Sequence, residues 1–283
     1  MDVSVIVLTW EDVERTSACV RSLPPAAEIV VVDNGSAAPV GEALRGMCAR
    51  TGAAYVRAPE NLGYAKGMNL GVAHSTRGTV VLANNDVIAE PGAVPALARR
   101  LADPAVGAAF PAVRDTDGVE RTGAGRFLSL PVGLGHATGL GLLWPRLRIT
   151  ATPERADWLS GPFVALRRQT LDRIGGVDES AFFYSEDLRL CWAVRQLGLR
   201  LAFVPEAVIT HEDDASARRR WSREEIARRQ TREFVRASRE QGGGRRRAAC
   251  AAYALGALVR ATVVRSPVRR AVARGAWEGL RAG

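Results

Sequence analysis

Apolar runs alternate with helical periodicities through the first 110 residues of the chain. Four short apolar runs, most of them rich in β-branched residues, lie at residues 3–8, 29–32, 54–57 and 79–83. Runs of this kind are typical of buried strands in a parallel sheet. Residues 13–23 repeat apolar side chains at the spacing of one helix face, and residues 63–75 predict a further helix. The alternation indicates right-handed βαβ units, so the sequence predicts an α/β fold with a mostly parallel central sheet flanked by helices.

The tripeptide Asn84-Asn85-Asp86 directly follows the run at 79–83. Ligands of open α/β sheets bind at the carboxyl ends of the strands, where this tripeptide is expected. Asp86 is therefore a candidate ligand for Mg²⁺ or Mn²⁺, because these cations favour oxygen and leave positions for phosphate and water. Asn and Asp are also common turn residues, so an ordinary strand-to-helix turn is the alternative interpretation.

Two further strand ends carry side chains that suit nucleotide recognition. The first strand ends in Thr9-Trp10-Glu11, and the second runs into Asp33 before a Gly/Ser turn. Trp10 is suited to stacking on a base, and Asp33 to accepting a hydrogen bond from a base or a ribose. The alternatives are a core aromatic for Trp10 and a turn-capping carboxylate for Asp33.

A glycine-rich segment at residues 61–71 follows the third predicted strand and matches neither a Walker loop nor the dinucleotide fingerprint. Its glycines permit close approach of the backbone to a ligand, and Lys66 is placed to reach a phosphate. The same residues fit a helix whose glycines pack tightly against its neighbours.

Acidic residues open a predicted helix in the second half of the chain. Glu186 and Asp187 precede apolar residues at helical spacing, and Gly198 marks the end of the pattern. The positive end of a helix favours an ionised carboxylate, which a general base requires, although acids at this position also serve helix stability alone. His211 follows another apolar run and has two interpretations, a ligand and a structural hydrogen-bonding residue.

Taken in order, these segments resemble the family-2 glycosyltransferases of GT-A fold, in particular the bacterial rhamnosyltransferase-like branch. The resemblance extends from about residue 3 to 215 and depends on the order of the motifs VSVIVLTW, VVDNGS, NLGYAKGMNLG, NND, WLSGPFVALRR, GGVDESAFFYSEDLRLCW and VITH. It implies a GT-A (Rossmann-like) sheet, a nucleotide-diphosphate sugar donor, Mg²⁺ or Mn²⁺ as cofactor, and inversion at the anomeric carbon.

The resemblance also implies roles for individual residues. Those around the nucleotide and the donor sugar are Thr9, Trp10, Glu11, Asp33, Gly63, Lys66, Asn69, Asn84 and Asn85. Asp86 corresponds to the metal-binding carboxylate, and His211 to a late histidine that contacts the metal or the diphosphate. Asp187 corresponds to the catalytic base, with Glu186 beside it. The candidates for the acceptor side are Trp158, Gly161 and Arg189.

Some positions depart from the family pattern. Trp10-Glu11 stands where relatives usually carry Tyr-Asn, so we expect an altered base pocket. Asp86 is the only acid of its triplet. Arg189 replaces a further acid of the catalytic motif, and we interpret it as helix surface rather than as a contact to an anionic acceptor.

Length and charge suggest three parts in a chain of 283 residues. We expect a nucleotide-sugar-binding half at 1–110, an acceptor-binding and catalytic half of the same domain at 111–216, and a basic helical C-terminal extension at 217–283.

Arginines that contribute to the formal net charge of +9 concentrate in this extension. Its apolar stretch at 248–264 falls short of the ~20 apolar residues of a spanning helix. A helix lying peripherally on an anionic membrane and a basic tail packed on the domain are both open interpretations. Nucleic-acid binding is not expected, because no recognition module accompanies the arginines.

The remaining features concern location and loops. The four cysteines match no zinc pattern, and strand one begins at once, so we expect a cytoplasmic protein, with peripheral contact at the inner face of the cell membrane. The Pro/Gly-rich residues 129–145 predict a flexible loop near the acceptor. Within it His136 is either a substrate contact or, as we favour, a loop residue without such a role.

The expected reaction is a metal-assisted, inverting hexosyl transfer in which Asp187 takes the proton of the acceptor hydroxyl. The branch suggests dTDP-L-rhamnose as the donor. A lipid-linked saccharide or a natural-product small molecule is the expected acceptor, in cell-envelope or antibiotic biosynthesis. The alternatives are a sugar-nucleotide-binding protein without catalysis and, in third place, a nucleotidyltransferase, which would need more basic side chains near the first strand.

Overall fold

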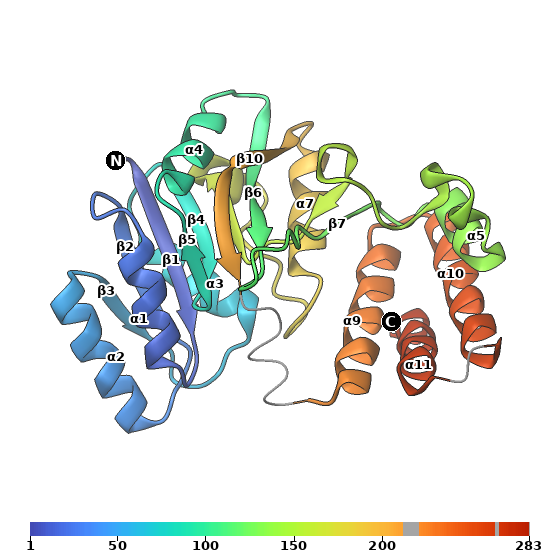
Figure 1. Ribbon diagram of the computed structural model, residues 1–283, viewed down its shortest axis with the longest axis horizontal. Helices are drawn as coiled ribbons and strands as arrows, with labels where there is room; N and C mark the ends of the chain where they lie inside the picture. The colour runs from blue at the N-terminus through green and yellow to red at the C-terminus, as the bar shows by residue number, and fades with distance from the viewer. Residues whose placement is uncertain (212–220, 264–265, 283) are drawn as a thin grey trace. The chain divides into compact units, whose positions relative to one another are not determined.

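The computed structural model describes residues 1–211, 221–263 and 266–282, and these divide into two compact units. The first unit comprises the described residues of Met1–Gly123, Ser160–Glu186 and Ala193–Asp213. The second unit comprises those of Ala124–Leu159, Asp187–Trp192 and Asp214–Gly283. Figure 1 shows the elements of both units along the chain. The boundaries expected at residues 110 and 216 stay predictions.

The first unit is built on a sheet whose strand order is β3-β2-β1-β4-β9-β6-β10-β5. Its strands are β1 (Val3–Thr9), β2 (Glu28–Asp33), β3 (Ala54–Arg57), β4 (Thr79–Asn84), β5 (Val87–Ala89), β6 (Val106–Arg114), β9 (Phe163–Arg167) and β10 (Arg200–His211). β1 to β4 are mutually parallel where they pair, and β10 is parallel to β6, whereas β9 and β5 run antiparallel to their neighbours. The four runs expected as strands are all confirmed, and the sheet is mostly parallel around β1.

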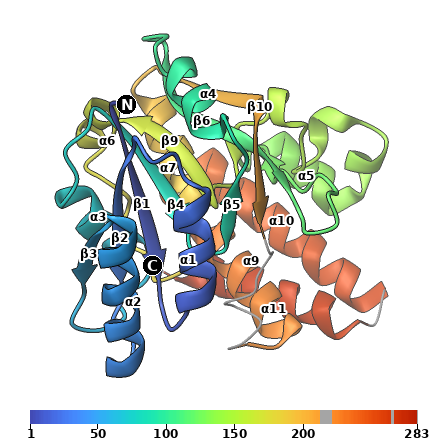
Figure 2. The same ribbon diagram turned by 60° about the vertical axis from the view of Figure 1, so that its left-hand side comes forward.

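Helices cover both faces of this sheet (Figure 2). They are α1 (Val13–Ser22), α2 (Ala38–Thr51), α3 (Tyr64–Ala73), α4 (Ala93–Arg100), α6 (Arg168–Arg173) and α7 (Glu186–Gln196), the last of which passes through both units. Side chains of α1, α2 and α4 form one buried core with Val5 and Val7 of β1. α3 lies on the other face, where a Cβ on Gly71 would come within 2.2 Å of Ile6. The interpretation of the 61–71 glycines as close-packing residues of a helix is thus confirmed at Gly71.

The second unit is mainly helical. It contains β7 (Ala124–Gly125), α5 (Leu130–Thr138), the 3₁₀ turns η1 (Leu140–Leu142), η2 (Pro145–Leu147) and η3 (Pro153–Arg155), β8 (Trp158–Leu159), α9 (Arg223–Glu240), α10 (Gly244–Val263) and α11 (Pro267–Arg281). Ser222 caps α9 by accepting a hydrogen bond from the amide of Glu225, as its Ser-X-X-Glu sequence predicts. Among the described residues, none of the helices combines the length and the apolar character needed to cross a bilayer.

The expectation of a flexible loop at residues 129–145 is wrong. Most of this segment is α5, η1 and the start of η2. Its glycines permit close helix packing rather than chain mobility, since a Cβ on Gly133 would come within 2.5 Å of the carbonyl oxygen of Ala249 in α10. His136 stacks on Tyr253, and burial together with the charge of Arg260 lowers its pKa to about 4, so this residue is part of the packing between α5 and α10.

Candidate functional site

The carboxyl ends of the central parallel strands lie side by side, as the sequence pattern requires. Thr9 at the end of β1 is in register with Asp33 at the end of β2, and Leu8 is in register with Asn84 at the end of β4. The polar residues expected around a nucleotide therefore start from a common edge of the first unit.

The residue that follows β4, Asp86, lies against the last residue of β10. β5 pairs with β10 so that His211 is in register with Val87, the residue next to Asp86. Oδ1 of Asp86 lies 3.2 Å from Nε2 of His211, and the two side chains are only 7% and 12% exposed. The contact is close enough for an ion pair, but Oδ1 is buried and accepts no hydrogen bond of good geometry from the described residues. Burying a carboxylate oxygen that accepts no hydrogen bond costs free energy unless a cation approaches it.

The donor set at Asp86 and His211 fits a divalent cation. Two ligands about 2.1 Å from a cation in an octahedral arrangement are about 3 Å apart, which is close to the 3.2 Å observed between these two atoms. No group of three or more His, Cys, Asp or Glu side chains suited to a metal occurs in the described part of the chain. A cation held here would therefore complete its shell with water and phosphate oxygens, as Mg²⁺ commonly does.

The two amides before Asp86 differ in their roles. Asn85 is buried, and its Nδ2 donates to the hydroxyl of Thr16 at 3.3 Å and to that of Thr9 at 3.4 Å. The Thr16 hydroxyl in turn donates to Thr9 at 2.7 Å, so Thr9 and Asn85 hold the strand ends together from inside. Asn84 is half-buried, and its backbone N–H donates to the carbonyl oxygen of Pro162.

Asp33 is fully buried and is engaged by its own chain. Its Oδ1 accepts the amide of Ser36 at 2.9 Å, and its Oδ2 accepts the hydroxyl of Tyr55 at 2.7 Å and the guanidinium of Arg57 at 2.6 Å. Burial raises the pKa of Asp33, but the hydrogen bonds from Ser36 and Tyr55 and the charge of Arg57 outweigh it, so the pKa lies below its ordinary value. The turn-capping interpretation is confirmed. Sequence reasoning missed Tyr55 and Arg57, although Arg57 at the end of β3 is the register partner of Asp33.

The loop after β1 is tied to the loop after β2 through Glu11. The backbone N–H of Glu11 donates to the Ser36 hydroxyl at 2.9 Å, and its carboxylate accepts the amide of Ala37 at 2.6 Å, just before α2. Glu11 has a φ of 56°, which a non-glycine residue rarely adopts. Trp10 is 42% exposed, so its interpretation as a core aromatic is wrong and its ring lies at the surface beside this loop.

The glycine-rich turn before α3 is organised by Asn34. The side chain of Asn34 accepts the amide of Leu62 at 3.0 Å and donates to the carbonyl oxygen of Gly63 at 3.1 Å. Gly63 has a φ of 83°, and a Cβ there would come within 2.7 Å of the carbonyl oxygen of Phe182, so only glycine fits. Lys66, in the first turn of α3, is exposed.

Asn69 in α3 binds a distant turn of its own chain. Its Oδ1 accepts the amide of Val177 at 2.9 Å, and its Nδ2 donates to the carbonyl oxygen of Val177 at 2.9 Å and to Glu179 at 2.8 Å. These bonds fix the turn that contains Gly176, which lies against the same amide.

The acidic pair opens α7, as its sequence predicts. Glu186 is the first residue of the helix, and Oδ1 of Asp187 accepts the amide of Leu188 at 2.7 Å. The two preceding residues, Tyr184 and Ser185, have φ angles of 79° and 68°. Left-handed conformations of non-glycine residues are strained and often occur at functional sites. This strained turn leads directly into the helix and its first carboxylates.

The three acceptor candidates lie in different surroundings. Trp158 of β8 is half-buried and donates from Nε1 to the carbonyl oxygen of Arg126 at 3.2 Å, while Gly161 lies in the half-buried turn between β8 and β9. Arg189 is only 7% exposed and forms an ion pair with Glu240 of α9. Its interpretation as exposed helix surface is wrong, because the side chain is buried and contacts this acid.

Comparison with known proteins places this geometry in a family context. The model of the family described as "Glycosyltransferase like family 2" matches residues 1–237. An N-acetylglucosaminyl-diphospho-decaprenol L-rhamnosyltransferase of Mycobacterium tuberculosis is 34% identical over 47% of this chain and 46% of its own length. A pre-mycofactocin glycosyltransferase of the same organism is 27% identical over 75% of this chain and 43% of its own length. The chain thus spans less than half the length of these two relatives.

A solved structure supports the fold over the whole chain. A mannosyltransferase from Pyrobaculum calidifontis, determined with GDP-Man and Mn²⁺, superposes with a TM-score of 0.61 at 18% sequence identity. The superposition covers 99% of this chain and 84% of that protein. The expected GT-A fold, with its mostly parallel sheet and C-terminal helices, is confirmed.

Proposed function

The chain belongs to the glycosyltransferase-like family 2, and we propose that it moves a sugar from a nucleotide-diphosphate donor to an acceptor hydroxyl with inversion at the anomeric carbon. The observation that carries this proposal is the buried contact between Asp86 and His211 beside the strand ends of the first unit. Family membership favours glycosyl transfer over nucleotidyl transfer, the third interpretation of the sequence.

The cofactor we propose is Mg²⁺ or Mn²⁺, held by Asp86 and His211. The fit rests on the orphaned Oδ1 of Asp86 and on the imidazole 3.2 Å from it. When bound, such a cation supplies Lewis-acid charge that offsets the negative charge growing on a departing diphosphate. Of the other residues of this unit, Trp10 is exposed for stacking on a base and Lys66 for pairing with a phosphate. Asn69 and Gly63 act by fixing the backbone near the donor.

The base we propose is Asp187, with Glu186 beside it. Its place in the first turn of α7 favours the ionised carboxylate, which is ready to accept a proton. As the acceptor oxygen bonds to the anomeric carbon and the bond to the diphosphate breaks, the hydroxyl proton passes to Asp187. No covalent intermediate with the protein is required, and the configuration inverts in this single displacement.

The donor we propose is dTDP-L-rhamnose, and the acceptor a lipid-linked saccharide or a natural-product small molecule. Support comes from the L-rhamnosyltransferase relative, whose printed name includes a diphospho-decaprenol, and from the pre-mycofactocin relative. Trp158 and Gly161 are proposed on the acceptor side. We further propose a cytoplasmic location with peripheral contact to the cell membrane through the C-terminal extension.

A thermal-shift screen tests this function. The protein is heated with Mg²⁺ or Mn²⁺ and a panel of dTDP-, UDP- and GDP-sugars, each with and without chelator. We expect metal-dependent stabilisation by dTDP-L-rhamnose above the other compounds. Stabilisation by UDP-sugars alone would refute the donor, and the absence of stabilisation by any nucleotide sugar would refute the function.

A further inference from the structure

Helix α10 buries mostly small side chains, together with Tyr253, and exposes four large aliphatic ones. The residues buried against the rest of the second unit include Ala249, Cys250, Ala254, Gly256 and Ala257. The exposed apolar residues are Leu255, Leu258, Val259 and Val263, at 59%, 52%, 47% and 76% exposure. Their spacing places them on one face of the helix. A helix whose only task is to complete a core buries its large side chains, so this arrangement indicates a second apolar surface.

The segment that follows α5 also exposes large apolar side chains. Leu142, Leu143 and Trp144 are 79%, 70% and 55% exposed. α5 packs along α10, since Gly256 lies against Ala137 and Arg260 donates to the carbonyl oxygen of His136 at 2.5 Å. The end of α5 therefore lies against the half of α10 that carries the exposed side chains, and residues 142–144 follow α5 by only a few positions along the chain. We name as the apolar face the residues Leu142, Leu143, Trp144, Leu255, Leu258, Val259 and Val263.

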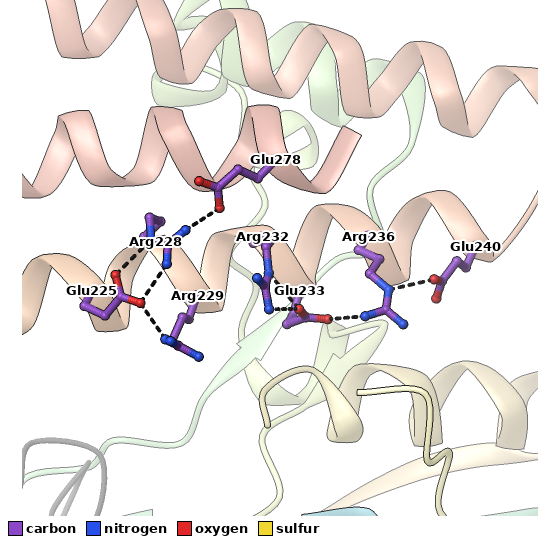
Figure 3. A network of polar contacts seen from close by, with 8 residues as sticks. All are labelled: Glu225, Arg228, Arg229, Arg232, Glu233, Arg236, Glu240 and Glu278. Atoms are coloured by element: carbon purple, nitrogen blue, oxygen red, sulfur yellow. Dashed lines mark hydrogen bonds and ion pairs between the residues drawn. The ribbon is translucent and has the colours of Figure 1, made fainter. Parts of the chain in front are cut away.

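Exposed positive charge accompanies the apolar face mainly on α10 and α11 rather than on α9. Four arginines of α9 are paired with acids in the network of Figure 3, in which Arg228, Arg229, Arg232 and Arg236 contact Glu225, Glu233, Glu240 and Glu278. By contrast, residues 244–283 contain nine arginines and a single acid, Glu278. Six of these arginines are exposed and form no ion pair with a described residue; they are Arg245, Arg247, Arg269, Arg270, Arg274 and Arg281.

We propose that the apolar face rests on an anionic lipid membrane, with the arginines of α10 and α11 contacting the headgroups. Large apolar side chains next to exposed arginines suit the boundary between acyl chains and anionic headgroups. Trp144 adds an aromatic side chain of the kind enriched at this depth. A second copy of the chain fits less well, because a symmetric contact would bring the same unpaired arginines of both copies together.

This inference rests on the proposed peripheral location at the membrane. It assigns the membrane contact to a defined surface rather than to the basic extension as a whole. It adds residues 142–144, which precede the extension by more than 70 positions, and it leaves out α9, where four arginines pair with acids within the second unit. The surface does not depend on the sugar or on the metal.

Vesicle flotation tests the proposal with the full chain. Wild-type protein is mixed with vesicles of phosphatidylcholine alone or of phosphatidylcholine with phosphatidylglycerol. We expect binding only to the second kind, weakening as salt is raised. Leu258→Ser with Val259→Ser, and separately Leu142→Ser with Leu143→Ser, should each weaken binding about tenfold or more, because each removes exposed apolar groups that would enter the bilayer. Arg269→Gln with Arg270→Gln should weaken it as well.

Matched controls come from the first unit. Val119, which is 49% exposed, is changed to Ser, and the exposed pair Arg50 and Arg99 is changed to Gln. These variants should float like wild type, and all variants should keep its melting temperature. Wild-type protein that ignores anionic vesicles, or apolar-face variants that float unchanged, would overturn the proposal. The proposal would also be overturned if wild type binds no vesicle and instead forms a dimer in sedimentation equilibrium. In that case the variant with Leu258→Ser and Val259→Ser would be a monomer. Sugar transfer to a soluble acceptor is measured in parallel. Its failure would contradict the proposed function and would leave the membrane contact untouched.

Discussion

Nε2 of His211 lies 3.2 Å from Oδ1 of Asp86, although the two residues come from different segments of the first unit that are far apart in sequence. The pairing of β5 with β10 produces this contact, because it places His211 beside Val87. Both side chains are nearly buried, so a cation that enters would meet a nitrogen and an oxygen that are already fixed. The entropy cost of ordering these two side chains is met when the chain folds, and this favours cation binding.

Replacing His211 by Asn should weaken Mn²⁺ binding about tenfold or more, because one of the two fixed ligands is removed while the fold is kept. Binding is measured by electron paramagnetic resonance of Mn²⁺ in the presence of a nucleoside diphosphate. His74→Asn is the matched control, since the side chain of His74, in the same unit, is exposed and contacts the carbonyl oxygen of Leu70 in the preceding helical turn. Equal Mn²⁺ affinity in the two variants would remove His211 from the site.

Replacing Asp187 by Asn should lower kcat by about 10²–10⁴-fold, because the acceptor hydroxyl would lose its base. Donor affinity, measured by calorimetry with dTDP-L-rhamnose and Mn²⁺, should stay near the wild-type value. Asp172→Asn serves as control, since Asp172 is an exposed carboxylate on another helix, α6. A variant at Asp187 that retains full transfer would end its assignment as the base, and the proton would then have to reach Glu186 or solvent.

Replacing Asn69 by Ala should lower the free energy of unfolding by about 1–3 kcal/mol, because the amide and carbonyl of Val177 lose their partners. Urea unfolding of the purified chain measures this change. Glu179→Gln is the control, because it keeps an acceptor for Nδ2 of Asn69. If Asn69 instead acted only by touching the donor, its variant would unfold like wild type and lose donor affinity alone.

The network on α9 predicts a pH dependence. The hydrogen bond from Arg228, together with that from Arg229, lowers the pKa of Glu225 from 4.5 to about 2. A carboxylate with a lowered folded-state pKa stabilises the fold above its unfolded pKa, and this contribution is lost as the pH falls through the folded value. The difference in unfolding free energy between wild type and Glu225→Gln should therefore shrink from pH 4.5 toward pH 2. Glu42→Gln, at a 74% exposed side chain on α2, should show no comparable change. A difference that stays constant over this window would contradict the network.

The sheet edge was accessible from sequence because the strands of the first unit are short apolar runs whose ends carry polar residues. Once the strands are parallel, register alone brings Thr9, Asp33 and Asn84 together. The contact of His211 with Asp86 was only anticipated through the family, since it depends on the antiparallel pairing of β5, a three-residue strand with no clear pattern of its own.

Side-chain partners that are distant in sequence were not predictable in the same way. The bonds of Asn69 to Val177 and the ion pair of Arg189 with Glu240 join elements whose spacing carries no periodic signal. Residues 129–145 were misread for a different reason. Glycine marks loops and close helix contacts alike, and only the position of α10 shows which of the two applies at Gly133.

Mn²⁺-dependent binding of a nucleoside diphosphate to the Asp86→Asn variant tests the account most directly. Calorimetry is run with and without Mn²⁺ on wild type, on Asp86→Asn and on Glu90→Gln, which changes a nearby acid that pairs with Arg114 at the surface. We predict that Mn²⁺ strengthens nucleotide binding in wild type and Glu90→Gln, and that this effect disappears in Asp86→Asn with the fold intact. An Asp86→Asn variant whose nucleotide affinity responds to Mn²⁺ as strongly as wild type would contradict the assignment of the metal site, and with it the proposed function of this edge of the sheet.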